Sequence, residues 1–589
     1  MNRVVRALVA ASLLMPAGAR AAVTVTLAQN YVQMEVGQAW QAKATVTGTG
    51  NHHVIWQVDN ANGGSTAAGK ISKSGLYTAP STVPLPAIAT VTAVSAADPT
   101  VSATATVTLL SQPLGGNVYY VAPDGNDANP GNLAEPWKTI EHAADVAGAG
   151  DTVFVRQGVY NEHIRLRKSG TAGRYITFAS YPGETAAVDG TGLDIPQNMW
   201  GLFTFDGASY VIVEGFEVRN YTTDSDKQVP IGIYVVGAGE GDQIVNNYLH
   251  DITTTAPATP KNCASNAFGM TVYGTQAPAA IDGLAISGNE VAFNHTGCSE
   301  TLSLDGNVTN FAVVSNVVHD DDNIGIGAIG FEHVSKDPAY DQARDGVIRG
   351  NTVYNITSYG NTDYGKQYAA DGIYVDGGTN IVIDQNRVHA VDLGIELASE
   401  HKGKTSSYII ARNNLVYDGN SAGISIGGYA ANKGGTDHCD IVGNTLYGND
   451  TKNTGSGEFQ IQFNATGNAF ENNIVTAGAQ GLLVNDFTTS TPDPAALDDN
   501  LYFSAGPSDF VWQKQRYKSF ASYVAGTGND PDSAFADPQF VDTAEFAVAP
   551  TSPAVGAGTD LGLPVVGPRA FSGAKRILGG AIDIGAQEQ

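Results

Sequence analysis

A short motif recurs along the second half of the chain: an Asn followed two positions later by an apolar residue, as in NYLH, NVVH and NTVY. Its eight copies begin at Asn247, Asn289, Asn316, Asn351, Asn386, Asn414, Asn444 and Asn473. The intervals between them are 42, 27, 35, 35, 28, 30 and 29 residues. A fixed local motif with a drifting period indicates stacked coils that share one core and differ in their loops.

The motif predicts three short strands per coil, with the Asn at a bend. This is the pattern expected of a right-handed parallel β-helix, in which buried Asn side chains stack and satisfy the backbone of successive coils. Leucine-rich repeats are the main rival, but the chain has no regular Leu framework. At a strand spacing of about 4.8 Å, the seven intervals account for about 34 Å of rod, with further coils before and after.

Four segments that follow Asn bends alternate apolar residues with Gly and polar residues, and alternation sends neighbours to opposite faces. They are IGIGAIGFEH (324–333), DGIYVDGG (371–378), LGIELASEH (393–401) and AGISIGGY (422–429). The inward residues are Ile326, Ala328, Ile373, Val375, Ile395, Leu397, Ile424 and Ile426. If the glycines are in register, two outward ladders result: Gly327, Tyr374, Glu396 and Ser425, and beside it Ile329, Asp376, Ala398 and Gly427.

The rest of the chain divides into shorter stretches. Alternating runs between residues 22 and 112 predict a small β-sandwich, and residues 111–116 form a linker. In the rod, residues 117–589, an amphipathic helix is expected at about 137–147 as an N-terminal cap. The closing segment is expected to form the last coils and a terminal strand.

The composition of the chain and its N-terminal sequence limit the classes of function and the location that we expect. Asp plus Glu number 58 against 31 Lys plus Arg, a net charge of −27, so a general nucleic-acid binder is excluded. Residues 1–21 combine basic, apolar and small residues in the order of a signal peptide. No other stretch is long and apolar enough to span a membrane. We therefore expect a soluble, exported monomer, extracellular or periplasmic. Cys263 and Cys298 either pair across neighbouring coils or remain buried thiols with Cys439.

Asp376 and Glu396 are the first candidate catalytic residues, because they lie among small outward residues that leave room for a sugar chain. Two Glu-His pairs follow the same strands and open loops that carry lysines. They are Glu332-His333 with Lys336, and Glu400-His401 with Lys402 and Lys404. His401 and Lys402 are the candidate proton carriers, with Glu400 beside them. Tyr374 and Tyr429 are candidate sugar platforms, and Glu332, His333 and Lys336 candidate substrate contacts.

Crowded carboxylates also suit Ca²⁺, which takes six to eight oxygen ligands. The candidate ligands are Asp305, Asp371, Asp376 and Glu396. The run Asp320, Asp321 and Asp322 is either a further site or a solvated turn. No zinc spacing or phosphate-binding loop is present in the sequence.

Three groups of motifs carry a family resemblance: the opening YVAPDGNDANPG…PWKTIEHA…GDTVFVRQGVY, the repeated Asn bends, and the ending SPAVGAGTD…GAIDIGAQE. Over residues 117–589 the chain resembles secreted pectate-lyase-like right-handed β-helix proteins. The N-terminal stretch, with Trp56 and KISKSGLYTAP, resembles bacterial Ig-like modules, which implies a spacer or attachment role. The first resemblance implies an all-β, pectin-lyase-like fold in a superfamily that hosts several chemistries.

The favoured function is β-elimination on an acidic, uronate-containing polysaccharide such as pectate or alginate, with Ca²⁺ assisting. An inverting glycoside hydrolase that uses Asp376 and Glu396 is the alternative, since the two lie diagonally on adjacent coils. A carbohydrate-binding or adhesive rod without catalysis is the third possibility.

Overall fold

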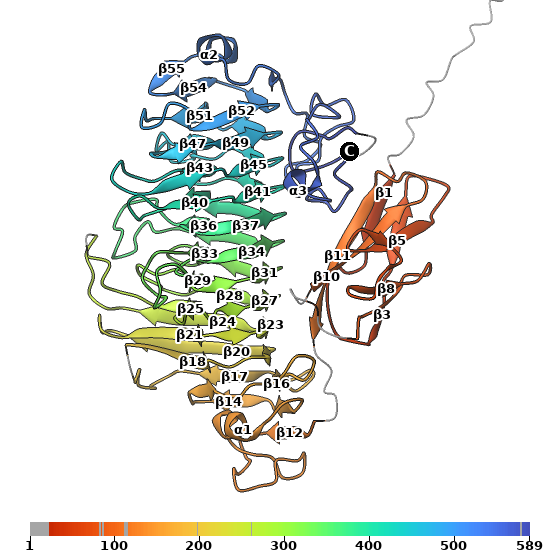
Figure 1. Cartoon of the computed structure of the whole chain (residues 1–589), viewed down its shortest axis with the longest axis vertical. Helices are drawn as coiled ribbons and strands as arrows, with labels where there is room; N and C mark the ends of the chain where they lie inside the picture. Colours follow the sequence, from red (N-terminus) through yellow and green to blue (C-terminus); the bar gives the residue numbers. More distant parts are fainter. Residues whose placement is uncertain are drawn as a thin grey trace, which may run out of the picture.

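The computed structural model describes residues 23–81, 84, 88–110, 116–196, 198–260, 262–577 and 580–589. A small β unit, here called the module, lies beside a long rod of stacked coils (Figure 1). The signal peptide predicted for residues 1–21 lies outside the described residues. Among the described residues, no helix has both the length and the apolar character needed to cross a bilayer.

The rod is built from three parallel sheets, to which each coil contributes in turn, and this confirms the predicted right-handed β-helix. Sheet 1 has 19 strands: β12 (Val118–Val121), β13 (Thr152–Val155), β16 (Ile176–Ser180), β19 (Val211–Glu214), β22 (Gly239–Glu240), β23 (Gln243–Val245), β26 (Ile281–Asp282), β27 (Ala285–Ser287), β30 (Val308–Thr309), β31 (Ala312–Val314), β34 (Arg344–Arg349), β37 (Thr379–Asp384), β40 (Thr405–Ser407), β41 (Ile410–Arg412), β44 (Gly435–Asp437), β45 (Asp440–Val442), β48 (Ala465–Thr466), β49 (Asn468–Glu471) and β52 (Ala495–Asp498).

Sheets 2 and 3 have 13 strands each. Sheet 2 contains β14 (Gly158–Tyr160), β17 (Ala186–Asp189), β20 (Phe216–Thr223), β24 (Tyr248–Thr254), β28 (Glu290–Ala292), β32 (Val317–His319), β35 (Thr352–Ile356), β38 (Arg387–Val391), β42 (Leu415–Tyr417), β46 (Thr445–Tyr447), β50 (Ile474–Ala477), β53 (Leu501–Ser504) and β56 (Ala534–Phe535). Sheet 3 contains β15 (Ile164–Leu166), β18 (Met199–Asp206), β21 (Val229–Val236), β25 (Phe268–Gly274), β29 (Leu302–Gly306), β33 (Ile326–Ile329), β36 (Asp371–Asp376), β39 (Leu393–Ala398), β43 (Ile424–Ile426), β47 (Phe459–Ile461), β51 (Leu482–Asp486), β54 (Asp509–Trp512) and β55 (Gln515–Tyr517); β55 pairs antiparallel.

The Asn bends stack as predicted. From Asn247 to Asn473, each side-chain Nδ2 donates to the Oδ1 of the next Asn at 2.9–3.2 Å, and the ladder ends on Asn500. From Asn289 onward, each Oδ1 also accepts the backbone N–H of the preceding Asn, as Asn351 does for Asn316 at 2.9 Å, whereas Asn247 Oδ1 accepts Phe216 N–H at 3.0 Å. All are buried. The ladder therefore satisfies backbone groups that the tight bends would otherwise leave unpaired inside the rod.

The two ends differ from the prediction in detail. The N-terminal cap helix α1 covers Ile140–Val146, three residues later than expected, because the Thr139 hydroxyl caps it by accepting His142 N–H at 3.2 Å. Helix α2 (Phe520–Thr527) lies at the other end (Figure 1). The coils stop at β56, and residues 537–577 and 580–589 fold back along the rod instead of extending it. This stretch has no Asn bend and contains prolines, which cannot donate to a ladder.

The module has its own core around Trp56, Val91 and Val107. Its strands are β1 (Thr24–Leu27), β2 (Tyr31–Glu35), β3 (Ala39–Gln41), β4 (Ala44–Thr47), β5 (Val54–Val58), β6 (Ala61–Asn62), β7 (Gly64–Ser65), β8 (Gly69–Ile71), β9 (Leu76–Thr78), β10 (Ile88–Ser95) and β11 (Ser102–Leu110). They form small, mostly antiparallel sheets. Its identification as an Ig-like module stays a prediction.

Cys263 and Cys298 form a disulfide, while Cys439 is buried and free. Of the two alternatives predicted from the sequence, the structure therefore shows the pairing of Cys263 with Cys298. The bond joins two loops that lie before β25 and β29, beside sheet 3. Asp363, from a third loop, accepts Ala264 N–H at 3.0 Å and so ties these loops together.

Candidate functional site

The first predicted outward ladder exists on sheet 3: Gly327 pairs with Tyr374, Tyr374 with Glu396 and Glu396 with Ser425. The alternate residues, such as Ile373 and Ile395, are fully buried in the core. In the second ladder Asp376 pairs with Ala398 as predicted. Ile329, however, bridges Gly377 rather than Asp376, because the chain turns away at the end of β33.

The acids of these strands are far less exposed than an outward position suggests. Asp376 is 3% exposed and Asp305 4%. Asp371, at the other end of β36, shares the inward parity of Ile373 and is 2% exposed. Loops that follow the strands fold over the sheet: Glu400 N–H donates to Asp376 Oδ1 at 2.8 Å, and the Gln462 amide donates to Glu396. The carboxylates therefore lie in a covered recess rather than on an open face.

Two of the loops meet over Asp376. Glu332, Asp376 and His401 each bring a ligand atom within 4.8 Å of the others. His401 Nε2 lies 2.9 Å from Glu332 Oε1, so the Glu of one predicted Glu-His pair contacts the His of the other. The sequence placed both pairs over the same end of the groove but could not match their members, because loop conformation decides which side chains meet.

Burial and mutual repulsion raise the pKa of several of these carboxyls. Burial raises the pKa of Asp376 to about 8 and that of Glu396 to about 7, with Glu400 adding like charge to both. Burial raises the pKa of Asp305 and that of Asp371 well above the ordinary range. The like charge of Glu300 raises the pKa of Asp305 further, and that of Glu396 raises the pKa of Asp371. Such shifts mark groups that need either a proton or a cation to be stable.

Glu300 is a member of this acid group that the sequence analysis missed. Burial raises its pKa to about 7, and Glu332 and Glu400 reinforce the shift. It reaches the ladder because Gly327 has no side chain: a Cβ there would lie 3.2 Å from Glu300 Cγ. The small residue opposite Tyr374 was the only signal in the sequence, and it did not identify which loop fills the space.

Lys433 is the second missed residue. Its Nζ lies 3.5 Å from Glu400 Oε2 and 4.6 Å from the centre of the Tyr429 ring, and both neighbours raise its pKa. Tyr374 OH also approaches Glu400, at 3.5 Å. Lys433 lies in the loop after β43, the loop position that Glu332 and Glu400 occupy after β33 and β39. That repeated loop position could have revealed it.

The remaining predicted residues lie at the edge of the recess. Lys402 is exposed and, within the described residues, forms no ion pair. His333 is exposed, and Lys336 Nζ donates to Gln276 at 2.9 Å. Lys404, from the His401 loop, lies 4.6 Å from the Phe331 ring.

Of the four predicted Ca²⁺ ligands, Asp376 belongs to the group that converges within 4.8 Å, together with Glu332 and His401, whereas Asp305, Asp371 and Glu396 do not. Asp305 Oδ1 and Asp371 Oδ1 are buried and, within the described residues, accept no hydrogen bond. Buried carboxylate oxygens without partners are costly unless a proton or an ion satisfies them. In the run at 320–322, Asp321 and Asp322 accept backbone N–H groups of Asn294 and Thr296, both at 2.7 Å, while Asp321 Oδ2 is likewise buried without a partner in the described chain.

The outward ladder continues beyond the prediction. Ser425 pairs with Gln460, Gln460 with Asn485, Asn485 with Val511 and Val511 with Arg516. A cavity of about 500 Å³ lies over this stretch, and Phe487, Lys514 and Arg516 help to line it. At about 4.8 Å per rung, the five rungs from Glu396 to Arg516 span about 24 Å. One row of paired outward residues thus joins the acidic recess to a cavity that carries Lys514 and Arg516, here called the basic cavity, in which Arg516 pairs with Asp509 at 2.5 Å.

Residues 119–268 match the family described as "Pel9A-like, right handed beta helix region". This match ends before Glu300, the first of the clustered acids in the chain. Over 444 residues the chain is 38% identical to the uncharacterised protein YwoF of Bacillus subtilis, an alignment that covers 74% of this chain and 92% of YwoF.

Over 138 residues the chain is 40% identical to pectate lyase PEL9 of Emericella nidulans, which covers 23% of this chain and 32% of that protein. The crystal structure of pectate lyase Pel9A matches 82% of this chain and 97% of its own, at 16% identity and a TM-score of 0.44. With the three-sheet rod, the family match and the extent of similarity to YwoF, the chain belongs to the Pel9A-like right-handed β-helix family.

Proposed function

We propose that the protein is an exported polysaccharide lyase that cleaves an acidic, uronate-containing polysaccharide by β-elimination with the help of Ca²⁺. The observation that carries the proposal is the continuous outward row on sheet 3. It begins at Tyr374 and Glu396 in the acidic recess and ends at Arg516 in the basic cavity. A row of this length suits a polymer, and its two ends suit a chain whose carboxylates need cations.

Asp376 and Glu332 are the proposed Ca²⁺ ligands, because with His401 they form the group whose ligand atoms lie within 4.8 Å of one another. When bound, the ion would neutralise the uronate carboxylate and so make the neighbouring C5 proton more acidic. Asp305, Asp371 and Glu396, also predicted as ligands, lie outside this group. The buried oxygen that Asp305 and Asp371 each leave without a partner in the described chain therefore does not support a shared ion.

His401 is the stronger of the two proposed bases. If Glu332 accepts the Nε2 proton across their 2.9 Å contact, the neutral ring keeps its lone pair on Nδ1, where it can take the C5 proton. Lys402, the other proposed base, is exposed at the edge of the recess and forms no ion pair within the described residues.

Lys433 and the nearby tyrosines are proposed to bind the sugar. The ammonium group of Lys433 shares Glu400 with the hydroxyls of Tyr374 and Tyr429, each at 3.5 Å. A uronate carboxylate could replace Glu400 as the partner of Lys433, while the tyrosine rings offer apolar faces to the sugar.

We also propose that the mature chain acts outside the cytoplasm as a monomer. The Cys263–Cys298 disulfide supports an oxidising compartment, since such bonds are rare in reducing ones. The sequence pattern of residues 1–21 supports export.

An inverting hydrolase remains the second candidate. Asp376 and Glu396 are diagonal on adjacent strands, and burial raises the pKa of Asp376 to about 8, as a general acid requires.

A panel of uronate polymers, pectate and alginate included, tests the proposal with Ca²⁺ and with EDTA. We expect ultraviolet absorbance from the new conjugated double bond, lost in EDTA and at least 100-fold reduced in His401→Ala and Asp376→Asn, with Lys402→Ala as the comparison. Reducing ends without absorbance would instead establish hydrolysis. Binding without either product would mean a non-catalytic rod.

A further inference from the structure

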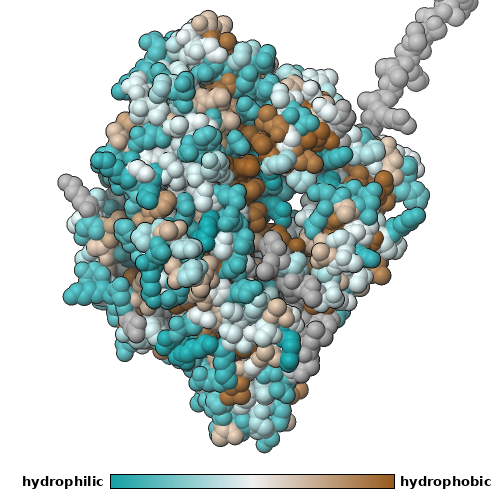
Figure 2. Space-filling view, in the orientation of Figure 1, coloured by the Kyte–Doolittle hydropathy of each residue, from teal (hydrophilic) through white to brown (hydrophobic). Residues whose placement is uncertain are grey.

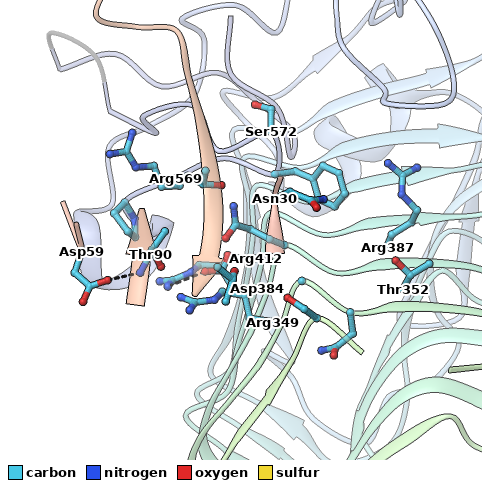
Figure 3. A pocket seen from close by; sticks show the side chains of 18 of the residues that line it. Asn30, Asp59, Thr90, Arg349, Thr352, Asp384, Arg387, Arg412, Arg569 and Ser572 are labelled. Carbon is cyan, nitrogen blue, oxygen red and sulfur yellow. Dashed lines mark hydrogen bonds and ion pairs between the residues drawn. The ribbon is translucent and has the colours of Figure 1, made fainter. Parts of the chain in front are cut away.

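A cavity of about 660 Å³ lies between the module and sheet 1, away from the recess on sheet 3. The hollow between the module and the rod is visible in Figure 2. Strands β34, β37 and β41 of the rod form one wall, and the folded-back tail and the module form the others (Figure 3). It is the meeting point of three parts of the chain that are distant in sequence.

Four arginines line this cavity: Arg349, Arg387, Arg412 and Arg569. In a chain with a net charge of −27, such a concentration of guanidinium groups is unexpected. Two of them are neutralised within the cavity wall. Arg412 pairs with Asp384 at 3.3 Å, and Arg387 pairs with Glu545 at 3.0 Å.

The other two have no carboxylate partner in hydrogen-bond contact among the described residues. Arg569 is 6% exposed and donates only to neutral groups, including Asn60 at 3.2 Å and Ser102 at 3.1 Å. Burial lowers the pKa of its guanidinium to about 10. A buried cation that lacks a counter-ion is costly, so an anion bound beside it would be stabilised.

Arg349 extends from the last position of β34, next to Asp384 on β37. Within the described chain its guanidinium donates no hydrogen bond. Asp59 is the third acid of the wall, and its Oδ1 accepts Thr90 N–H at 2.7 Å. Burial raises the pKa of Asp59, although the positive charge of Arg349 acts to lower it. Five guanidinium N–H groups of Arg349 are therefore available to a ligand.

The rest of the wall is rich in hydroxyl and amide groups, with one aromatic ring. Thr104, Thr106 and Thr352 contribute hydroxyls and Asn30 an amide, while Phe571 lies 5.2 Å from the Arg387 guanidinium. Hydroxyl and amide groups match sugar hydroxyls, an aromatic ring matches an apolar sugar face, and Arg matches a carboxylate bidentately. The volume is in the range of sites that hold a small ligand.

From this arrangement we infer a second, non-catalytic site between the module and the rod that binds a short acidic oligosaccharide through Arg349 and Arg569. The choice of uronate sugars as the acidic units rests on the proposed function, whereas the arginine site itself does not. The ligand would contact both the module and the rod, so the relative position of the two would depend on whether an acidic fragment is bound.

Titration calorimetry of the full-length Asp376→Asn protein in EDTA, with trigalacturonate as the probe and maltotriose as the neutral control, tests the inference. We expect trigalacturonate to bind and maltotriose not to bind. Arg349→Gln should weaken this binding at least tenfold, because it removes the unpaired guanidinium. Arg344→Gln, in the same strand but outside the cavity, is the matched control and should change it less than twofold.

A second variant guards against misfolding. Asn30→Asp adds a negative charge from the exposed module side and should also weaken binding while the circular dichroism stays unchanged. Unchanged affinity in both folded variants overturns the site. Equal displacement by inorganic sulfate at matched concentration overturns the saccharide assignment. Arg516→Gln distinguishes the two sites, because it should impair polymer cleavage but leave trigalacturonate binding intact. If the oligosaccharide binds but the protein has no lyase activity, only the proposed function is refuted.

Discussion

Replacing Asp376 with Asn should stabilise the metal-free protein while removing its activity. The carboxyl is 3% exposed, and burial raises its pKa from 3.8 to about 8. Asn keeps an oxygen to accept Glu400 N–H, but carries no charge. The change therefore removes the cost of the buried charge and keeps the local geometry.

The magnitude follows from the pKa. At ~1.4 kcal/mol for each pH unit between 3.8 and 7, the buried carboxyl lowers the free energy of unfolding at pH 7 by up to ~4 kcal/mol. Relaxation of the recess and water entry reduce this, so we expect the variant to gain about 2 kcal/mol in EDTA. A carboxyl with a raised pKa in the folded state binds its proton more tightly there, so stability declines as pH rises from about 4 to about 8. The advantage of the variant must widen over this window.

Urea unfolding in EDTA at pH 5 and pH 8, followed by circular dichroism, measures the difference. Asp532→Asn, an exposed acid outside the recess, is the control and should show no widening. Ca²⁺ should stabilise the wild type more than Asp376→Asn. A variant that is less stable than wild type in EDTA at pH 8, or a gap that does not grow with pH, refutes the argument that Asp376 is a buried charge awaiting a cation.

Two further predictions concern the ladder and the recess. Asn351→Ala should lower the free energy of unfolding by about 3 kcal/mol, because Asn316 N–H and Val313 C=O lose their partner inside the rod; urea midpoints should fall well below those of the exposed control Asn310→Ala. Lys433→Met should raise KM for an acidic polymer about tenfold and leave kcat within threefold, since it removes substrate binding only; a KM unchanged in steady-state assays would rule out its contact with the sugar.

The sequence predicted those parts of the fold that repeat. Asn bends recur in the coils from Asn247 onward, with alternating strands beside them, so the register that aligns Tyr374 with Glu396 could be read from glycine spacing alone. Features that occur once could not be predicted. The path of the tail and the meeting of Glu332 with His401 depend on how individual loops pack, and no periodic pattern encodes that.

The burial of the site is the second feature that the sequence did not predict. A strand pattern assigns Asp376 to the outside, but whether that outside is open depends on loops such as the one that brings Glu400 N–H onto its carboxylate. Glu300 and Lys433 reach the recess in the same way. Loop residues therefore supply much of the chemistry, while the strands supply its alignment.

The folded-back tail has a consequence for biogenesis. Arg569 holds module residues synthesised more than four hundred positions earlier, and Ala586 N–H donates to Thr445 on the flank of the coils. A chain made from its N-terminus can wind its coils as they are synthesised, but it cannot fix the module in place until Arg569 has been made. The tail from Arg569 onward thus holds the module against the rod, and truncating the chain before Arg569 should release the module even though every coil is complete.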